Sequence, residues 1–157
     1  MDGKVVVITG ASGALGKVVA ETAAARGARV AGVDHATSQL PATDNRIELG
    51  GVDLSDAASA KKAIDAAAAH FGRLDALVNI AGGFAFETVA DGDPQTWQHM
   101  YALNVLTALN ASRSAIPHLV TFGAGRICDL EHHRDSLWRS QLAVNFATYL
   151  RSWRRIR

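Results

Sequence analysis

Short runs of aliphatic and β-branched residues alternate along the chain with longer alanine-rich stretches whose apolar positions recur at helical spacing. The apolar runs predict strands at residues 4–9, 29–34, 46–53, 74–82 and 125–130. The alanine-rich stretches predict helices at 14–27, at 56–72 and from Pro94 to about Pro117. Strands and helices that alternate in this way need crossover connections, so we expect an α/β fold: a doubly wound parallel sheet between two layers of helices.

The residues at the ends of the predicted helices support these limits. Gly27 and Gly72 can end the first two helices, because glycine readily adopts the left-handed conformation that often follows a helix. Ser55 can cap the start of the second helix, and Pro94 can open the third.

The segment TGASGALG at 9–16 joins the first predicted strand to the first helix and contains three glycines. A helix that begins directly after a strand points unpaired N–H groups outward, and its dipole favours an anion there. Gly10 would permit the tight turn, Gly13 would let the backbone approach a diphosphate, and Gly16 would let the helix pack closely on the sheet. The alternative is a plain strand-to-helix turn that binds nothing.

Asp34 ends the second predicted strand, 18 residues after Gly16. An acid about 20 residues beyond such a turn accepts hydrogen bonds from the hydroxyls of an adenosine ribose. A carboxylate there would repel a 2′-phosphate, so we expect NAD rather than NADP. Asp34 could instead be a solvated residue at a strand end. Lys17 or Arg29 could bind a phosphate, although a place on the surface is the more ordinary role for both.

Length and charge limit the classes of function. A chain of 157 residues corresponds to about one domain, and its net charge of +1 predicts neither a nucleic-acid nor a membrane partner. The first residues lack a basic-then-apolar leader, and no apolar run approaches the roughly 18 residues that cross a bilayer. Cys128 is the single cysteine, which excludes an internal disulfide. We therefore expect a cytoplasmic protein.

Further motifs follow the glycine turn in a regular order. VDLSD carries Asp53, NIAGG closes the fourth predicted strand, YALNVLTAL carries Asn104 on the third helix, and GRI at 125–127 opens the fifth strand. Together these motifs resemble the short-chain dehydrogenase/reductase family over about residues 3–127. The resemblance implies a Rossmann-like fold and hydride transfer between a nicotinamide cofactor and the carbonyl or alcohol carbon of a small-molecule substrate.

The resemblance also implies roles for single residues. Asp53 matches the family's aspartate on the adenine ring, and Asn104 matches the asparagine whose backbone carbonyl holds a water of the proton relay. Each also has a structural interpretation: Asp53 could merely end a strand, and Asn104 could be an ordinary helix residue. The expected cofactor-binding residues are Thr9, Gly10, Ser12, Gly13, Leu15, Gly16, Asp34, Asp53, Leu54, Asn79, Ala81 and Gly82. Among these, Thr9 and Asn79 could instead serve only to hydrogen-bond the neighbouring backbone.

The chain departs from the family pattern in its glycine turn. Ala14 stands where the commonest branch has its middle glycine, and the spacing TGxxGxxG is that of the extended branch. The combination of GALG with AGGF also resembles dihydropteridine reductase and its relatives, so the subfamily stays open.

A second departure concerns the proton donor. The family uses a tyrosine as acid and base, a lysine four residues later, and a serine about 13 residues before the tyrosine. No YxxxK occurs in this chain. Ser136 and Tyr149 imitate the serine–tyrosine spacing, but Trp153 occupies the lysine position. Without the lysine, the phenol would keep the ordinary tyrosine pKa of about 10. Asn104 is therefore the main catalytic candidate, with Ser136 and Tyr149 as further candidates.

The residues directly after GRI differ from the family as well. Glu131, His132 and His133 stand where the serine is expected. Adjacent histidines point apart on a helix or a strand, and no further ligands gather near them in the sequence. We therefore predict no metal site.

The composition changes near residue 125. Residues 1–124 contain nine Lys/Arg and twelve Asp/Glu, a net charge of −3, whereas residues 125–157 contain seven Arg and three acids, a net charge of +4. We assign 1–127 to a dinucleotide-binding domain and 128–157 to an atypical basic segment. Helical spacing predicts a helix there through Trp138, Leu142, Phe146, Tyr149 and Trp153.

This basic segment has three interpretations. It could be a closing helix on the sheet, or a basic amphipathic helix for a membrane surface or nucleic acid. The abrupt change of composition also fits a frameshifted end on a truncated dehydrogenase.

Three functional hypotheses follow: a shortened or altered NAD-dependent reductase, a non-catalytic dinucleotide-binding module, or an interaction protein that uses the tail. A sheet truncated after its fifth strand would expose an apolar edge, so we also expect a homo-oligomer.

Overall fold

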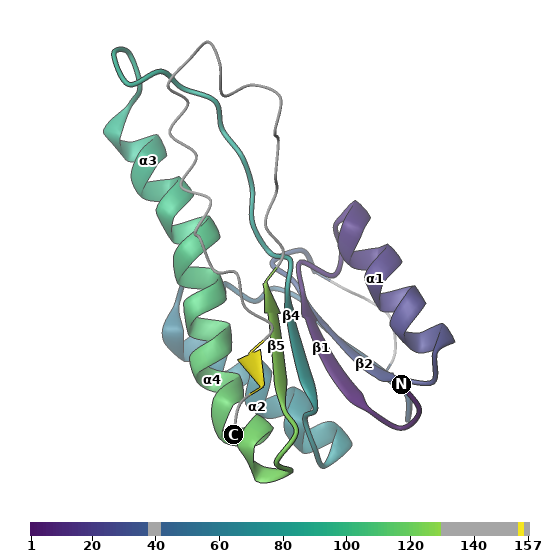
Figure 1. Ribbon diagram of the computed structural model, residues 1–157. Helices are drawn as coiled ribbons and strands as arrows, with labels where there is room; N and C mark the ends of the chain where they lie inside the picture. Colours follow the sequence, from purple (N-terminus) through teal and green to yellow (C-terminus); the bar gives the residue numbers. More distant parts are fainter. Residues whose placement is uncertain (38–41, 130–153, 156–157) are drawn as a thin grey trace.

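The computed structural model describes residues 1–37, 42–129 and 154–155 (Figure 1). Its strands form one sheet in the order β3-β2-β1-β4-β5-β6. The strands are β1 (Val5–Thr9), β2 (Arg29–Val33), β3 (Arg46–Leu49), β4 (Ala76–Asn79), β5 (Arg126–Asp129) and β6 (Arg154–Arg155). The helical segments are α1 (Ala14–Ala25), α2 (Ala57–Phe71), α3 (Pro94–Tyr101), the π-helical η1 (Ala102–Leu106) and α4 (Thr107–Thr121).

The first five strands are parallel, which confirms the predicted doubly wound, Rossmann-like α/β fold. The chain moves outward from β1 to β2 and β3, and then crosses back to β4 and β5 on the other side of β1. The strand order therefore reverses between β1 and β4. In open α/β sheets, ligands bind outside the carboxyl ends of the strands at this kind of reversal.

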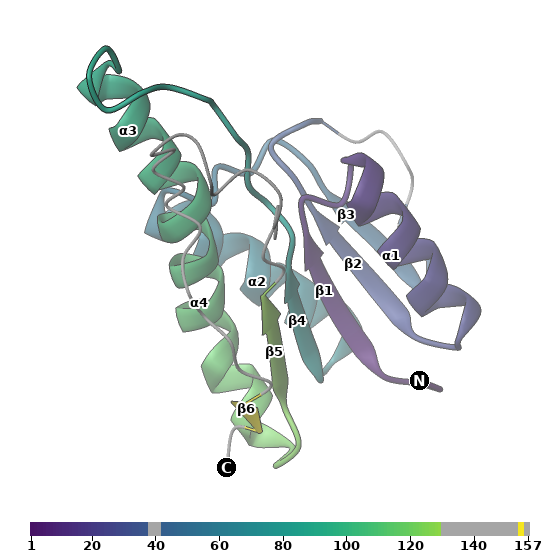
Figure 2. The same ribbon diagram turned by 45° about the horizontal axis from the view of Figure 1, so that its top comes forward.

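Two hydrophobic layers hold the helices on the sheet. On one face, Val5, Val7 and Leu77 pack with buried residues of α2 and α4. On the other face, Val6 and Ile8 pack with buried alanines of α1. The alternation of inward-facing side chains along β1 supplies both layers, which explains why the whole strand is buried. Figure 2 shows α1 on one side of the sheet and α2 and α4 on the other.

Three of the predicted helix-end residues, Gly27, Gly72 and Pro94, take the places expected from the sequence, but the predicted cap of α2 does not. Gly27 follows α1 with a φ of +82° and Gly72 follows α2 with a φ of +73°, as expected for glycines that end helices. Pro94 opens α3, as predicted. The predicted cap of α2 by Ser55 is wrong: the Asp56 carboxylate accepts from the Ser59 N–H instead, at 2.7 Å.

The third predicted helix differs in two ways. It is interrupted by η1, in which Thr107 N–H bonds to Ala102 O, five residues back. It also continues through Pro117 to Thr121. Figure 1 shows that α3 extends beyond the carboxyl end of the sheet, where the long connection from β4 reaches it.

The strands are shorter than predicted, and the chain's last described segment is a strand. β3 ends at Leu49, so Asp53 lies in the loop before α2 and not at a strand end. The prediction of a helical C-terminal segment is wrong at Arg154 and Arg155, which form β6 antiparallel to Ile127 and Arg126. This pairing covers part of the β5 edge that we expected to be open. Residues 130–153, which include the rest of the predicted closing helix, lie outside the described residues.

Candidate functional site

The glycine turn lies at the carboxyl end of β1 and needs two of its glycines for steric reasons. Gly10 has a φ of +67°, and a Cβ there would lie 2.8 Å from the Ala81 backbone nitrogen. A Cβ on Gly16 would overlap the Gly10 carbonyl oxygen and lie 2.8 Å from the Ala11 Cα. Gly16 thus lets α1 pack against the turn itself, whereas the sequence predicted packing against the sheet.

Gly13 is the N-cap of α1, and it leaves the start of the helix open. No side chain caps this helix, and its first turn contains no acidic residue. The first N–H groups of an α-helix have no partner within the helix, so they present a partial positive charge. Gly13 and Leu15 are exposed here. The absence of a Cβ at Gly13 fits the close approach of a diphosphate. A large side chain at this position would exclude the diphosphate, and a carboxylate would repel it.

Thr9 joins the two strands at the reversal point. Its hydroxyl oxygen accepts from the backbone N–H groups of Ile80 at 3.0 Å and Ala81 at 3.1 Å. Thr9 is 1% exposed. These contacts match the role of bonding the neighbouring backbone that the sequence left open for Thr9: the side chain aligns the end of β4 with the end of β1.

Asp34 follows β2 and lies against the glycine turn. One carboxylate oxygen accepts from the Ser12 N–H at 2.8 Å, and the other accepts from the Ala36 N–H at 2.9 Å. The structure thus brings the predicted ribose acid and the predicted diphosphate turn into direct contact. The carboxylate is partly buried, and backbone amides hold it in one orientation.

Asp53 and Leu54 lie in the loop between β3 and α2. The Ser55 hydroxyl and backbone N–H both donate to Asp53 and hold the pKa of its carboxyl below the usual range. A positive charge on His35 acts in the same direction. Leu54 is 5% exposed, so its side chain anchors the loop in the core while Asp53 remains at the surface.

Asn110 of α4 fixes this loop, and the sequence did not single it out. Its side-chain amide donates to Leu54 O at 3.1 Å and to Ser55 O at 2.9 Å. Asn110 is 9% exposed. A polar residue at a core-facing position of a helix whose neighbours are Ala111 and Ala115 is a signal that could have identified it.

Asn79 ends β4 and belongs to a buried polar cluster. Its Nδ2 donates to Ser112 Oγ at 3.1 Å and to Asp129 Oδ1 at 2.7 Å. Its Oδ1 is buried without a partner among the described residues. Asn79 therefore links β4 to both α4 and β5. Ser112 and Asp129 were not predicted, because only the pairing of β4 with β5 brings Asp129 beside Asn79.

Asn104 lies in η1, where it holds the backbone that follows β4. Its Oδ1 accepts from the Gly83 N–H at 3.1 Å, and its Nδ2 donates to Met100 O at 2.9 Å. A Cβ on Gly82 would lie 2.7 Å from Asn104 Oδ1, so a glycine is needed at this approach. π-Helical turns inside α-helices occur frequently at functional sites. The structure thus brings Asn104 and Gly82 together at the carboxyl edge.

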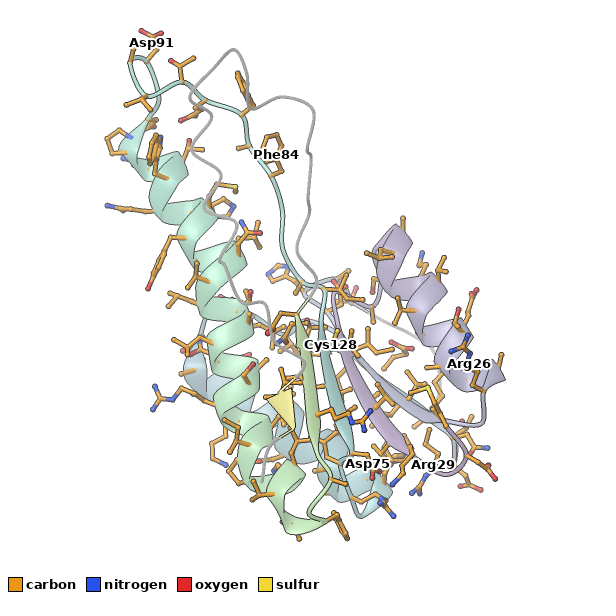
Figure 3. All side chains as sticks on the ribbon, in the orientation of Figure 1. Arg26, Arg29, Asp75, Phe84, Asp91 and Cys128 are labelled. Carbon is orange, nitrogen blue, oxygen red and sulfur yellow. The ribbon has the colours of Figure 1, made fainter. Side chains whose placement is uncertain are left out.

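The predicted residues up to Asn104 therefore gather along one edge of the sheet, formed by the ends of β1, β2 and β4 and by the β3–α2 loop. The further candidates Ser136 and Tyr149, and also Trp153, lie outside the described residues. Figure 3 shows Phe84 beyond this carboxyl edge, with Asp75 and Arg29 at the opposite edge.

Within residues 1–37, 42–129 and 154–155, there is no cluster of three or more His, Cys, Asp or Glu residues arranged to hold a metal ion. No described helix combines the length and the apolar character needed to span a bilayer.

Comparison with known proteins places this geometry in a family. A family model described as short chain dehydrogenase matches residues 4–131. D-threitol dehydrogenase of Mycolicibacterium smegmatis is 33% identical over 139 residues, which make up 83% of this chain and 53% of that protein. D-beta-hydroxybutyrate dehydrogenase of Cupriavidus necator is 29% identical over 137 residues, 83% of this chain and 53% of that protein.

Solved structures agree with these matches. A short-chain dehydrogenase/reductase of Serratia marcescens has a TM-score of 0.73 and 32% identity, and the match covers 82% of this chain and 57% of that one. The 3-ketoacyl-(acyl-carrier-protein) reductase of Brucella melitensis, solved in complex with NADH, has a TM-score of 0.72 and 27% identity, with 82% and 57% covered. The chain spans about half the length of the curated relatives it matches. It belongs to the short-chain dehydrogenase family, whose members are oxidoreductases.

Proposed function

We propose that this chain binds NAD along the carboxyl edge of β1, β2 and β4 and forms the cofactor-binding part of an oxidoreductase that acts on a carbonyl or alcohol. One observation carries the proposal: the uncapped start of α1 at Gly13 lies beside the Asp34 carboxylate, which is bonded into the same turn. Anion-binding amides and a ribose-binding acid are the two features that a dinucleotide needs at such an edge.

The residues of the chain fit parts of the cofactor as follows. The open N–H groups after Gly13 would hold the diphosphate, and Asp34 would accept from the hydroxyls of the adenosine ribose. Asp53 would contact the adenine. The Asp34 carboxylate supports the choice of NAD over NADP, because it would repel a 2′-phosphate. When bound, the nicotinamide ring would supply or accept the hydride.

The residues near the reacting end have supporting roles in this proposal. Asn104 holds the Gly83 backbone and so shapes the segment that follows β4. Ala81 and Gly82 keep large side chains away from this part of the edge. The proton donor is expected beyond the described residues, where Ser136 and Tyr149 remain the candidates. A homo-oligomer and a cytoplasmic location stay predictions of the sequence.

A second candidate function is a dinucleotide-binding module without turnover. The observation that favours it is Trp153, which stands four residues after Tyr149, where the family has its lysine. A tyrosine without that lysine would be a poor acid near neutral pH. The two candidates share the cofactor site and differ only in catalysis.

The test is a fluorescence titration with NADH, combined with a reductase assay on a panel of carbonyl compounds. We expect saturable binding that weakens about tenfold in Asp34→Ala, because one charge-assisted hydrogen-bond acceptor is lost. The matched control is Glu21→Ala, which removes an exposed acid from α1. Binding without turnover supports the module. A folded protein that binds no NADH, or an Asp34→Ala variant that binds as well as the unchanged chain, would overturn the proposed function.

A further inference from the structure

A pocket of about 380 Å³ lies between α2 and α4, on the opposite side of the sheet from α1 (Figure 2). The two helices are joined at two places. Asn110 of α4 donates to the carbonyls just before α2, and further along both helices His118 Nε2 lies 2.8 Å from Asp65 Oδ1. Small-molecule sites commonly have volumes of about 300–1,000 Å³, so this pocket suits a compact ligand.

The charges that line the pocket do not cancel. Lys61 donates to one oxygen of the Asp65 carboxylate, and His118 contacts the other. Hydrogen bonds from Lys61 and His118 hold the pKa of Asp65 below its usual range, so this carboxylate is charged and already has partners. Among the described residues, no acid pairs with Arg113. With His118 neutral, the guanidinium of Arg113 is therefore the unbalanced charge of the pocket.

The rest of the lining indicates what kind of anion fits. Ala57 and Pro117 present apolar atoms, and the side-chain stems of Lys61 and Arg113 add methylene groups. The planar fork of a guanidinium matches a carboxylate, with which it forms two parallel hydrogen bonds. A dianion such as phosphate would bring a second negative charge close to Asp65. The lining thus favours a compact organic monoanion that has a carboxylate and an apolar body.

The pocket shares Asn110 with the loop that carries Asp53. Asn110 lines the pocket, and its amide donates to two carbonyl oxygens of that loop, Leu54 O and Ser55 O. A ligand that bridges Arg113 and the start of α2 would favour the arrangement in which Asn110 holds the loop. NADH would need the same arrangement, because Asp53 is the residue proposed to contact the adenine. Two ligands that prefer the same arrangement raise each other's affinity.

We propose that this pocket binds a small organic carboxylate through Arg113 and that the bound anion raises the affinity of the chain for NADH. The second part rests on the proposed function, because it needs the cofactor at the Asp53 loop. The first part does not depend on the cofactor. Coupling between two sites is reciprocal, so NADH should raise the affinity for the carboxylate by the same factor.

The test of binding is a titration with benzoate, followed by nuclear magnetic resonance of the backbone amides. We expect saturable shifts at Lys61 and Arg113, and an affinity about fivefold lower in Arg113→Gln, because one charge-assisted contact near the surface is lost. Arg26→Gln, which removes an exposed arginine at the end of α1, is the matched control and should bind benzoate like the unchanged chain. Benzyl alcohol, which has the ring without the charge, should bind more weakly than benzoate.

Two results would overturn the first part. Inorganic phosphate that binds as tightly as benzoate would show a general anion site, so the proposed ligand class would be wrong. A folded chain without benzoate shifts around the pocket, or an Arg113→Gln variant with undiminished affinity, would overturn the site itself. The proposed function would stand in both cases.

The effect on the cofactor is measured by fluorescence titration with NADH, with and without saturating benzoate. We expect benzoate to raise NADH affinity about fivefold in the unchanged chain, at the low end of coupling between two sites, and to leave it unchanged in Arg113→Gln. If benzoate binds in the pocket but NADH affinity stays the same, the second part is wrong. If the folded chain binds benzoate but no NADH, the proposed function fails together with the second part, and the carboxylate site stands.

Discussion

The carboxylates at the two edges of the sheet have different kinds of partners. At the amino edge, Asp75 accepts from the Arg73 guanidinium at 2.6 Å, from Lys4 Nζ at 3.0 Å and from the Val5 N–H at 3.0 Å. At the carboxyl edge, the partners of Asp34 among the described residues are the backbone N–H groups of Ser12 and Ala36. Asp75 is thus paired with two cations, whereas Asp34 is paired with no cation among the described residues.

Packing follows the same division. At the amino edge, the Arg29 guanidinium lies 5.4 Å from the centre of the Phe71 ring, and the Arg73 guanidinium lies 4.8 Å from that of Phe122. At the carboxyl edge, Gly10, Gly16 and Gly82 occupy places where a side chain would collide. The charged side chains at the amino edge therefore contact other parts of the same chain. At the carboxyl edge, the backbone of the glycine turn and the Asp34 carboxylate remain available to a ligand.

Among the variants considered, Gly16→Ala should lower the stability of the carboxyl edge most. The added Cβ overlaps the Gly10 carbonyl oxygen, which cannot move without changing the turn. We expect the free energy of unfolding, measured in urea, to fall by about 3 kcal/mol or more. Gly51→Ala is the control, because its φ is +71° but nothing lies within 4 Å of the added Cβ. It should cost only about 1 kcal/mol. Equal losses in the two variants would contradict the steric account.

Asp75→Asn should weaken the amino edge by about 2 kcal/mol, because Lys4 and Arg73 lose their shared anion. Burial raises the pKa of Asp75, but hydrogen bonds from Arg73, Val5 and Lys4 outweigh it and lower the pKa to about 2. A carboxyl group whose pKa is lower in the folded state than in the unfolded state stabilises the protein at pH values above the unfolded-state pKa. This stabilisation is lost as the pH falls toward the folded-state pKa.

The pH dependence of Asp75→Asn follows from that sign. The difference in unfolding free energy between the two proteins should be constant above about pH 5 and should shrink as the pH falls from about 4 to about 2. Urea denaturation at pH 6, 4 and 3 measures it, and the other carboxylates cancel in the difference. A gap that stayed the same at pH 3 would show that Asp75 is not the titrating group.

Asn110→Ala should loosen the loop that carries Asp53 and cost about 1.5 kcal/mol, since Leu54 O and Ser55 O lose a common donor. NADH affinity should fall together with stability. Ser114→Ala, which removes a hydroxyl bonded only to the Asn110 backbone among the described residues, serves as control. A loss of stability with unchanged NADH affinity would show that Asn110 does not contribute to the cofactor site.

Lys4→Gln should have the smallest effect, about 0.5 kcal/mol, because its side chain is 50% exposed and Arg73 remains on Asp75. NADH affinity should not change, because Lys4 lies at the amino edge. A tenfold change in affinity would show that the two edges are not independent.

The fold and most of the carboxyl edge could be predicted because they depend on local sequence. Buried parallel strands appear as continuous apolar runs, and the glycines between β1 and α1 mark a turn that other residues cannot adopt. The same locality explains why Asp34 was found: its distance from Gly16 along the chain is set by one helix and one strand.

The features that were missed depend on contacts between distant residues. Asn110 acts on a loop that lies 55 residues earlier, and Asp129 becomes relevant only when β5 pairs with β4. Asp56 and Ser55 are both able to cap α2, and only the side chain that reaches Ser59 decides between them. The helical spacing near the C-terminus likewise gave no sign that Arg154 and Arg155 would pair with β5.

Hydrogen–deuterium exchange with and without NADH tests most directly whether the two edges have different roles. NADH should add protection at the amides after Gly10, around Asp34 and in the Asp53 loop, with no change at Val5 or around Asp75. Protection that is absent from the glycine turn, or that appears mainly at the amino edge, would show that the two edges do not have these different roles.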